Sequence, residues 1–167
     1  DEKECSMIIL GLYNGHNAAA CVMKDGQILI NWELERFSRI KHDYGFNQAF
    51  LDKTLEHCNI TFDDVELIIT NSQDFKRPPP WKVPSTAVNY LESFMINNKQ
   101  AYALNHHLAH VASAYYTSPF NEATIITQDG GGDDENFSYG TAQDNHITGF
   151  RSGRVRNIAS YWSGITL

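Results

Sequence analysis

The chain has 167 residues, a formal net charge of −7, 42% hydrophobic residues and 20% charged residues. A chain of this length can bury a core, and this composition excludes a disordered tail. The acidic balance argues against a broad phosphate-binding surface for DNA or RNA, and no apolar run approaches the roughly 20 residues of a membrane-spanning helix.

The opening of the chain predicts a three-stranded antiparallel meander behind a short leader. Residues 1–6 are acidic and polar, so they are expected to be a leader outside the fold rather than a signal peptide. The apolar runs that follow are typical of buried strands, and Asp25-Gly26 between the second and third is a strong hairpin signal. The three strands are expected at residues 7–13, 18–24 and 27–32, with a turn at residues 14–17.

Strands and helices alternate in the rest of the chain. Asn47 can cap an amphipathic helix over residues 47–58, because apolar side chains there fall on one face. The proline-rich residues 71–86 are expected to form a loop. The other expected elements are a capping-type turn at 61–64, strands at 66–70, 99–104 and 122–128, helices at 87–96 and 107–116, and a hairpin from 137–143 and 147–150. This order predicts an α/β fold with a mixed sheet flanked by helices.

Cysteine usage favours a reducing compartment. Cys5, Cys21 and Cys58 are scattered, and they form neither a CxxC pair nor a plausible disulfide framework. A cytoplasmic location is therefore expected. The acidic charge and the lack of a long apolar run, described above, predict neither nucleic acid nor a membrane as a partner.

The sharpest local signal is the run Asn-His-His-Leu-Ala-His over residues 105–110. If a helix begins here, His106 and His110 lie one turn apart on the same face, with Cβ atoms roughly 6 Å apart, and could bind one metal ion. His107 is rotated by about 100° and would not join them. His107 also stands where an HExxH metalloprotease has its glutamate base, which argues against that class. The alternative is a helix start whose histidines only form local hydrogen bonds.

A second signal follows the strand at 122–128. Asp129 would lie at its carboxyl end, where ligands of open α/β sheets bind. Gly130, Gly131 and Gly132 free backbone N–H groups that could cradle a phosphate. The alternative is a glycine-rich hairpin turn, and the acidic residues 133–135 are interpreted as a solvated turn.

Two further segments could bind a ligand. The turn that contains Asn14, Gly15 and His16 could hold a phosphate or a substrate hydroxyl, or be a plain hairpin turn. Positive charge gathers in residues 36–42, which include Arg39 and Lys41. That segment is either an anion site or a solvated loop.

Four stretches of the sequence, taken in order, resemble the amino-terminal part of the O-carbamoyltransferase family, whose members carbamoylate nodulation factors, cephamycins and tobramycin-type antibiotics. The stretches are ILGLYNGHNAAA at 9–20, ELERFSRIKHD at 33–43, HHLAHVASAYY with SPF at 106–120, and TQDG at 127–130. The ERFSRxKHD and HHLAHxASAYY patterns are the specific ones, and the resemblance runs from Met7 to Leu167.

The resemblance implies a fold and an activity. The fold would be a ribonuclease-H-like lobe of the actin-like ATPase class, formed by residues 7–167, with the second lobe and an adenylate-forming domain absent. The activity would be ATP-dependent transfer of a carbamoyl group from carbamoyl-adenylate, made from carbamoyl phosphate, to a hydroxyl of a small-molecule or sugar acceptor. The remaining domains and a second copy of the chain, in a homodimer, are possible partners. The alternative is a non-catalytic nucleotide- or sugar-binding module of the same fold.

The resemblance also implies roles for particular residues. A divalent metal would be held by His106, His110 and Asp129 and by a second aspartate beyond Leu167, with Fe²⁺ as the first choice and Zn²⁺ or Mn²⁺ as alternatives. His16 is the candidate base for the hydroxyl proton. Lys41 and Arg39 would hold phosphate or leaving-group charge. The nucleotide-binding assignment covers Asn14, Gly15, Arg39 and Gly130–Gly132.

Overall fold

The chain forms two compact units. A computed structural model describes residues 6–45, 47–71 and 90–156, and the expected loop at 71–86 lies almost wholly outside them. The first unit comprises Asp1–Ser85 and Leu91–Ala103, and the second comprises Thr86–Tyr90 and Leu104–Leu167. The assignment of residues 7–167 to one lobe of a larger fold stays a prediction.

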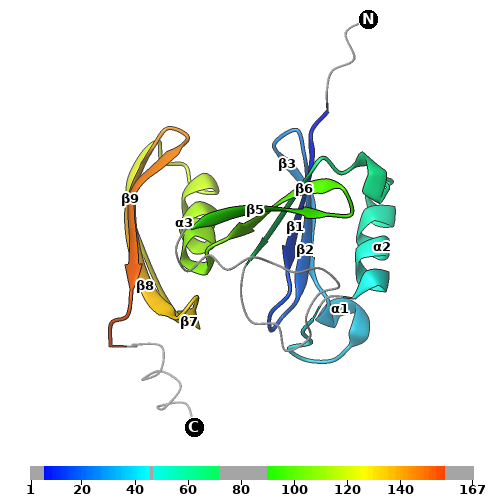
Figure 1. The fold of residues 1–167 in the computed structure, drawn as a ribbon, viewed down its shortest axis with the longest axis horizontal. Helices are drawn as coiled ribbons and strands as arrows, with labels where there is room; N and C mark the ends of the chain where they lie inside the picture. The colour runs from blue at the N-terminus through cyan, green and yellow to red at the C-terminus, as the bar shows by residue number, and fades with distance from the viewer. Residues whose placement is uncertain (1–5, 46, 72–89, 157–167) are drawn as a thin grey trace, which may run out of the picture. The chain divides into compact units, whose positions relative to one another are not determined.

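A six-stranded mixed sheet dominates the first unit (Figure 1). Its strands are β1 (Ile8–Tyr13), β2 (Ala19–Lys24), β3 (Gln27–Glu33), β4 (Leu67–Asn71), β5 (Leu91–Ile96) and β6 (Lys99–Leu104), in the spatial order β3-β2-β1-β4-β6-β5. β1 pairs antiparallel with β2 and parallel with β4, and β2 pairs antiparallel with β3. The predicted meander and the mixed α/β sheet are therefore confirmed. Asp25 and Gly26 form the β2–β3 turn, both with positive φ, as a two-residue hairpin requires.

The predicted capped helix is α2 (Gln48–His57), which lies against one face of this sheet (Figure 1). The Asn47 side chain accepts a hydrogen bond from the backbone N–H of Ala49 at 3.0 Å. Before α2 the chain forms the short helix α1 (Glu35–Ser38), and after it the 3₁₀ helix η1 (Phe62–Asp64), which carries the predicted capping interaction at Thr61.

The core of the first unit forms where α2 covers the sheet. Alternate residues of β1 point inward, as the period of two along a strand requires, and Leu10 and Ile68 lie opposite each other in the parallel pairing of β1 with β4. The α2 side chains that the pattern placed on one face, Phe50, Leu51, Thr54 and Leu55, are all buried.

The predicted helix at 87–96 is wrong over the residues that the structure describes. Residues 91–96 form strand β5, which pairs with β6 at the edge of the sheet. Asn97 and Asn98 both have positive φ, at 47° and 63°, and make the two-residue turn between the strands. Burial alternates along β5, but apolar Leu91 and Met95 stand at its exposed positions, so its apolar residues give no clear period of two.

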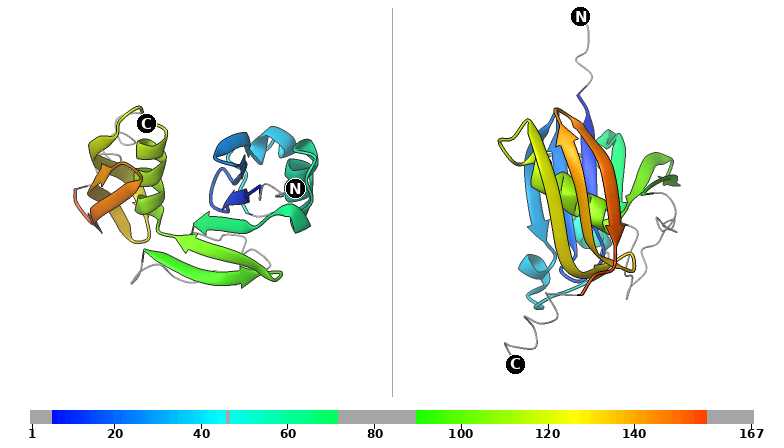
Figure 2. Two further views of the ribbon diagram at one scale, coloured as in Figure 1. Left: turned by 90° about the horizontal axis from the view of Figure 1, so that it is seen from above. Right: turned by 90° about the vertical axis from the view of Figure 1, so that its left-hand side faces the viewer.

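The second unit packs one helix against an antiparallel sheet (Figure 2). Helix α3 (His106–Tyr116) lies across strands β7 (Glu122–Gly132), β8 (Glu135–Gln143) and β9 (His146–Gly153). Val111 and Tyr115 of α3 contact a core that includes Ile125 and Phe150. The predicted helix and hairpin are confirmed, but β7 continues through the glycine run that was expected to follow it. No helix in the described ranges is long and apolar enough to cross a membrane.

Shortening Leu10 tests this core. Leu10 is fully buried, so Leu10→Ala is expected to lower the free energy of unfolding of the first unit by about 2–5 kcal/mol, because it leaves a cavity. Leu29 on β3 is 45% exposed, and Leu29→Ala is expected to change it by no more than about 0.5 kcal/mol. Chemical denaturation of both variants measures the difference, and equal losses would contradict the packing described.

Candidate metal centre

The first turn of α3 is fixed by two side-chain acceptors. Asn105 accepts a hydrogen bond from the backbone N–H of Leu108 at 3.1 Å, and Asp133 accepts one from the backbone N–H of His106 at 2.7 Å. The first N–H groups of a helix have no partner within the helix, and a carboxylate there also interacts favourably with the helix dipole. The helix therefore begins at His106, one residue earlier than predicted.

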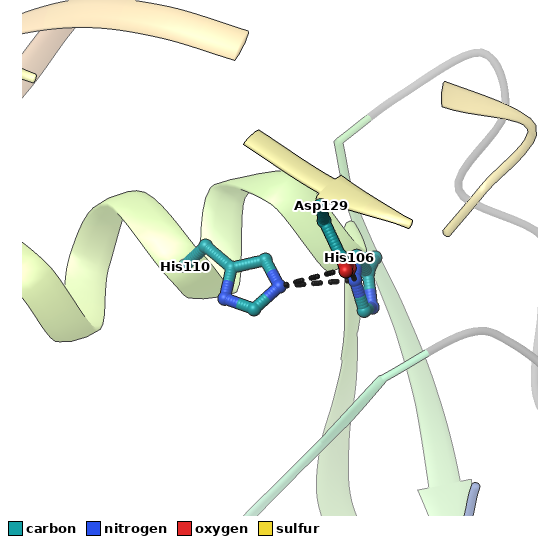
Figure 3. A group of neighbouring side chains, drawn as sticks. All are labelled: His106, His110 and Asp129. Atoms are coloured by element: carbon teal, nitrogen blue, oxygen red, sulfur yellow. Dashed lines mark hydrogen bonds and ion pairs between the residues drawn. The ribbon is translucent and has the colours of Figure 1, made fainter. Parts of the chain in front are cut away.

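Three predicted ligands converge beside this turn (Figure 3). Nε2 of His106 and Nε2 of His110 are 3.0 Å apart. Oδ2 of Asp129 lies 2.5 Å from Nε2 of His106 and 3.3 Å from Nε2 of His110. The i, i+4 spacing thus puts both imidazoles on one face, as predicted. Asp129, which was expected at the carboxyl end of its strand, lies three residues before the end of β7, and there its carboxylate reaches them.

The electrostatics of the cluster keep Asp129 ionised. Burial by itself raises the pKa of Asp129, but hydrogen bonds from His106, from the backbone N–H of Gly130 and from His110, together with the charge of His106, outweigh it. The pKa of this carboxyl is therefore lowered. The side chain of His106 is 15% exposed and that of His110 is 46% exposed, so the cluster remains open to solvent on the His110 side.

The spacing of the three atoms fits one metal ion. Ligand atoms about 2.1 Å from a tetrahedral metal lie roughly 3.4 Å from one another. The separations of Nε2 of His110 from the other two atoms, 3.0 Å and 3.3 Å, are close to that value. The separation between His106 and Asp129 would have to lengthen by about 1 Å.

His107 turns away from this cluster and ties α3 to β7. Its side chain is fully buried, and its Nδ1 lies 3.0 Å from Oγ1 of Thr127, which lies 2.6 Å from Oγ of Ser138. Among the described residues, Nε2 of His107 has no hydrogen-bond partner. Because Thr127 lies two residues before Asp129 on the same strand, this contact helps to fix the ligand helix relative to the ligand strand.

The glycine run forms the end of β7 and leads into a tight turn. The pairing of β7 with β8 is irregular between Gln128 and Gly132, and Asp133 and Asp134 make the turn with φ of 52° and 61°. A Cβ added at Gly132 would collide with the imidazole of His106, whereas one at Gly130 would meet nothing within 4 Å. The absence of a Cβ at Gly132 therefore makes room for the imidazole of His106, a proposed metal ligand. The phosphate-binding role of Gly130–Gly132 stays a prediction.

The acidic turn is only partly solvated, contrary to its interpretation from sequence. The side chain of Asp134 is 93% exposed, as expected of a solvated turn, and it forms an ion pair with Arg154. Asp133 instead caps α3, and Oε2 of Glu135 is buried. Local sequence does not reveal the cap, because Asp133 lies 27 residues after its partner in the chain.

The other predicted site residues lie in the first unit. Asn14 is buried, and the end of the Tyr13 side chain lies against Gly15 in the turn after β1, where a Cβ at Gly15 would displace it. His16 is exposed, and its Nδ1 lies 3.1 Å from Oδ1 of Asn17. Their roles in nucleotide binding and catalysis stay predictions.

The basic segment is organised by a carboxylate that sequence analysis missed. Glu35 is 7% exposed, accepts the backbone N–H of His42 at 2.9 Å, and pairs with Nζ of Lys41 at 3.1 Å. The hydrogen bond from His42, followed by those from Lys41 and by nearby positive charge, lowers the pKa of Glu35. Lys41 is thus already paired with Glu35, and Arg39 ends α1 with φ of 60°.

Comparisons with known proteins agree with the resemblance. Residues 77–154, which include the three converging residues, match the family described as carbamoyltransferase N-terminus. The chain is 29% identical to an uncharacterised protein of Methanocaldococcus jannaschii over 95% of its length, 28% identical to one of Synechocystis over 80%, and 26% identical to nodulation protein NolNO of Sinorhizobium fredii over 71%.

These matches confirm that the chain resembles the amino-terminal part of carbamoyltransferases. The chain spans only 20–29% of the length of these relatives.

Two alanine substitutions test the space around His106. Gly132→Ala is expected to displace the imidazole and to weaken divalent-metal binding about 10- to 100-fold, the range seen when groups that orient ligands are altered. Gly130→Ala, where a Cβ has free space, is expected to leave metal affinity unchanged. Metal titration of both variants checks this. Equal metal affinities in the two variants would show that the position of the His106 imidazole does not depend on the absence of a Cβ at Gly132.

Acid stability tests Glu35. A carboxyl whose pKa is lower in the folded state stabilises the fold above its unfolded pKa of about 4.3, and this stabilisation is lost as pH falls through the folded value. Glu35→Gln is expected to be less stable than the wild type at pH 7, with the difference shrinking below about pH 4. Chemical denaturation across this pH range measures it, and a constant difference would contradict the assignment.

Proposed function

We propose that the protein is an ATP-dependent O-carbamoyltransferase that moves a carbamoyl group from carbamoyl-adenylate to a hydroxyl of a small-molecule or sugar acceptor. The observation that carries this proposal is the convergence of His106, His110 and Asp129 within the segment that matches the carbamoyltransferase family. Carbamoyl phosphate and ATP would supply the adenylate, in parts of the protein beyond this chain. The family also suggests a ribonuclease-H-like, actin-like fold, which the meander and the parallel β4 support.

The three converging residues would hold a divalent cation. Two histidines and one carboxylate with open positions are a donor set typical of non-haem Fe²⁺, and Zn²⁺ or Mn²⁺ are alternatives. Such a cation would supply positive charge that stabilises negative charge developing on an oxygen. The chain's own contribution is to hold Asp129 ionised and to present both Nε2 atoms on one face of α3.

The residues of the first unit have proposed roles in proton transfer and anion binding. His16 is exposed and is the candidate base for the hydroxyl proton, a role worth about 10²–10⁴ in rate. Lys41 and Arg39 are candidates for holding phosphate or leaving-group charge, although Lys41 would share its ammonium with Glu35. The nucleotide-binding role of Asn14 and Gly15 is part of the same proposal.

Removing one imidazole tests the proposal. In the full-length protein, His106→Ala is expected to abolish bound metal and to lower carbamoyl transfer at least 100-fold, because several kcal/mol of charge stabilisation is lost. His146→Ala, at an exposed position at the start of β9, is the matched control and is expected to keep both. Metal analysis and a transfer assay measure the two effects.

The outcome separates transfer from simple binding. Full metal content and activity in His106→Ala would remove the triad from the mechanism. A non-catalytic nucleotide- or sugar-binding module would bind ATP or carbamoyl-adenylate equally with and without Fe²⁺, which calorimetry on the wild type would reveal.

A further inference from the structure

Two loops of the first unit are joined where His16 and His42 lie. The turn after β1 pairs with the loop after α1 through a backbone bridge between His16 and Tyr44. Next to this bridge, the N–H of Ala18 donates to the carbonyl of Asp43 at 3.0 Å. The loops are therefore held in a fixed register, and His42 is brought to Asn17, 25 residues earlier in the chain, and so to its neighbour His16.

The side chain of Asn17 joins the two imidazoles. Its Oδ1 lies 3.1 Å from Nδ1 of His16 and 3.0 Å from Nδ1 of His42. A carbonyl oxygen has two lone pairs, so it can accept both N–H groups at once. Asn17 itself has φ of 59°, a conformation that asparagine tolerates better than most residues, and the backbone of His42 is held by Glu35.

This arrangement determines which nitrogen of each ring carries the proton. A neutral imidazole has one N–H and one bare nitrogen, and the hydrogen bond made by one nitrogen sets the state of the other. If both Nδ1 atoms donate to Asn17, both Nε2 atoms are left as acceptors. The neutral amide of Asn17 can accept both hydrogen bonds without placing a negative charge beside the two rings, as a carboxylate would.

We infer that Asn17 is a positioning residue that holds His16 and His42 as the Nδ1–H tautomer, so that each ring presents Nε2 to a hydroxyl donor. His42 thereby becomes a second imidazole beside the candidate base. The use of these rings in taking the proton of the acceptor hydroxyl rests on the proposed carbamoyl transfer, whereas the tautomer does not.

The tautomers can be measured directly in the full-length protein labelled with ¹⁵N-histidine. Long-range ¹⁵N–¹H correlation spectra distinguish protonated from bare ring nitrogens, and His16→Gln and His42→Gln assign the signals. The wild type is expected to show Nδ1–H in both rings. Asn17→Gly removes the acceptor but keeps a residue that adopts φ of 59° without strain, and it should lower the ratio of Nδ1–H to Nε2–H about fivefold, the worth of one hydrogen bond.

Two further variants complete the test. Asn17→Asp keeps an acceptor oxygen and is expected to retain the Nδ1–H form, and Asn31→Ala, at an exposed position on β3, is the control for loss of an asparagine. Wild-type rings in the Nε2–H form, or ratios that are unchanged in Asn17→Gly, would overturn the inference.

Kinetics separate this inference from the proposed function. Asn17→Gly is expected to lower kcat for transfer in proportion to the fraction of rings that keep a bare Nε2, by no more than about fivefold and with little change in KM for the acceptor, and Asn17→Asp to restore it, because only those rings can take the proton. Unchanged kcat in Asn17→Gly, alongside altered tautomers, would overturn the role of the rings in transfer. No transfer by the wild type would contradict the proposed function while the spectra still decide the role of Asn17.

Discussion

The convergence of two imidazoles and a carboxylate depends on holding the first turn of α3 against the end of β7. Atoms 2.5–3.3 Å apart on different elements stay together only if the elements themselves cannot slide. Two contacts prevent sliding: the cap from Asp133 to the His106 N–H and the buried contact of His107 with Thr127. The absence of a Cβ at Gly132 lets the His106 imidazole lie against the strand. Each contact lies within four residues of a proposed ligand, so the orientation of the ligands is a property of the local packing.

Local patterns in the sequence account for much of this structure. The capped helix α2, the Asp25-Gly26 hairpin and the pairing of His106 with His110 follow from the periods of helix and strand and from residues that adopt special conformations. The convergence with Asp129 was expected only from the family resemblance, because Asp129 lies 23 and 19 residues from the two histidines and no local pattern links them. For the helix, the hairpin and the histidine pair, the determining residues are neighbours in the sequence or repeat at a fixed period.

The features that sequence analysis missed depend on tertiary contacts, on burial or on a place in the sheet. The cap from Asp133 acts on a helix 27 residues earlier, and β5 is a strand because of its place at a sheet edge. In the sequence, Glu35 cannot be distinguished from the other charged residues of its polar segment, and only the structure shows that it is buried. These residues differ from solvated ones only in tertiary contacts, for which a single sequence carries no periodic signal.

The close approach of the His106 imidazole to Gly132 has a consequence for how this sequence can vary. Alanine is ordinarily the mildest replacement for glycine in extended backbone, yet here its single methyl group would occupy the volume of an imidazole. Tolerance along the run of three glycines is therefore uneven, since the outer position at 130 has room for a side chain and the innermost one has none. A substitution scale based on chemical similarity would rank these positions as equals.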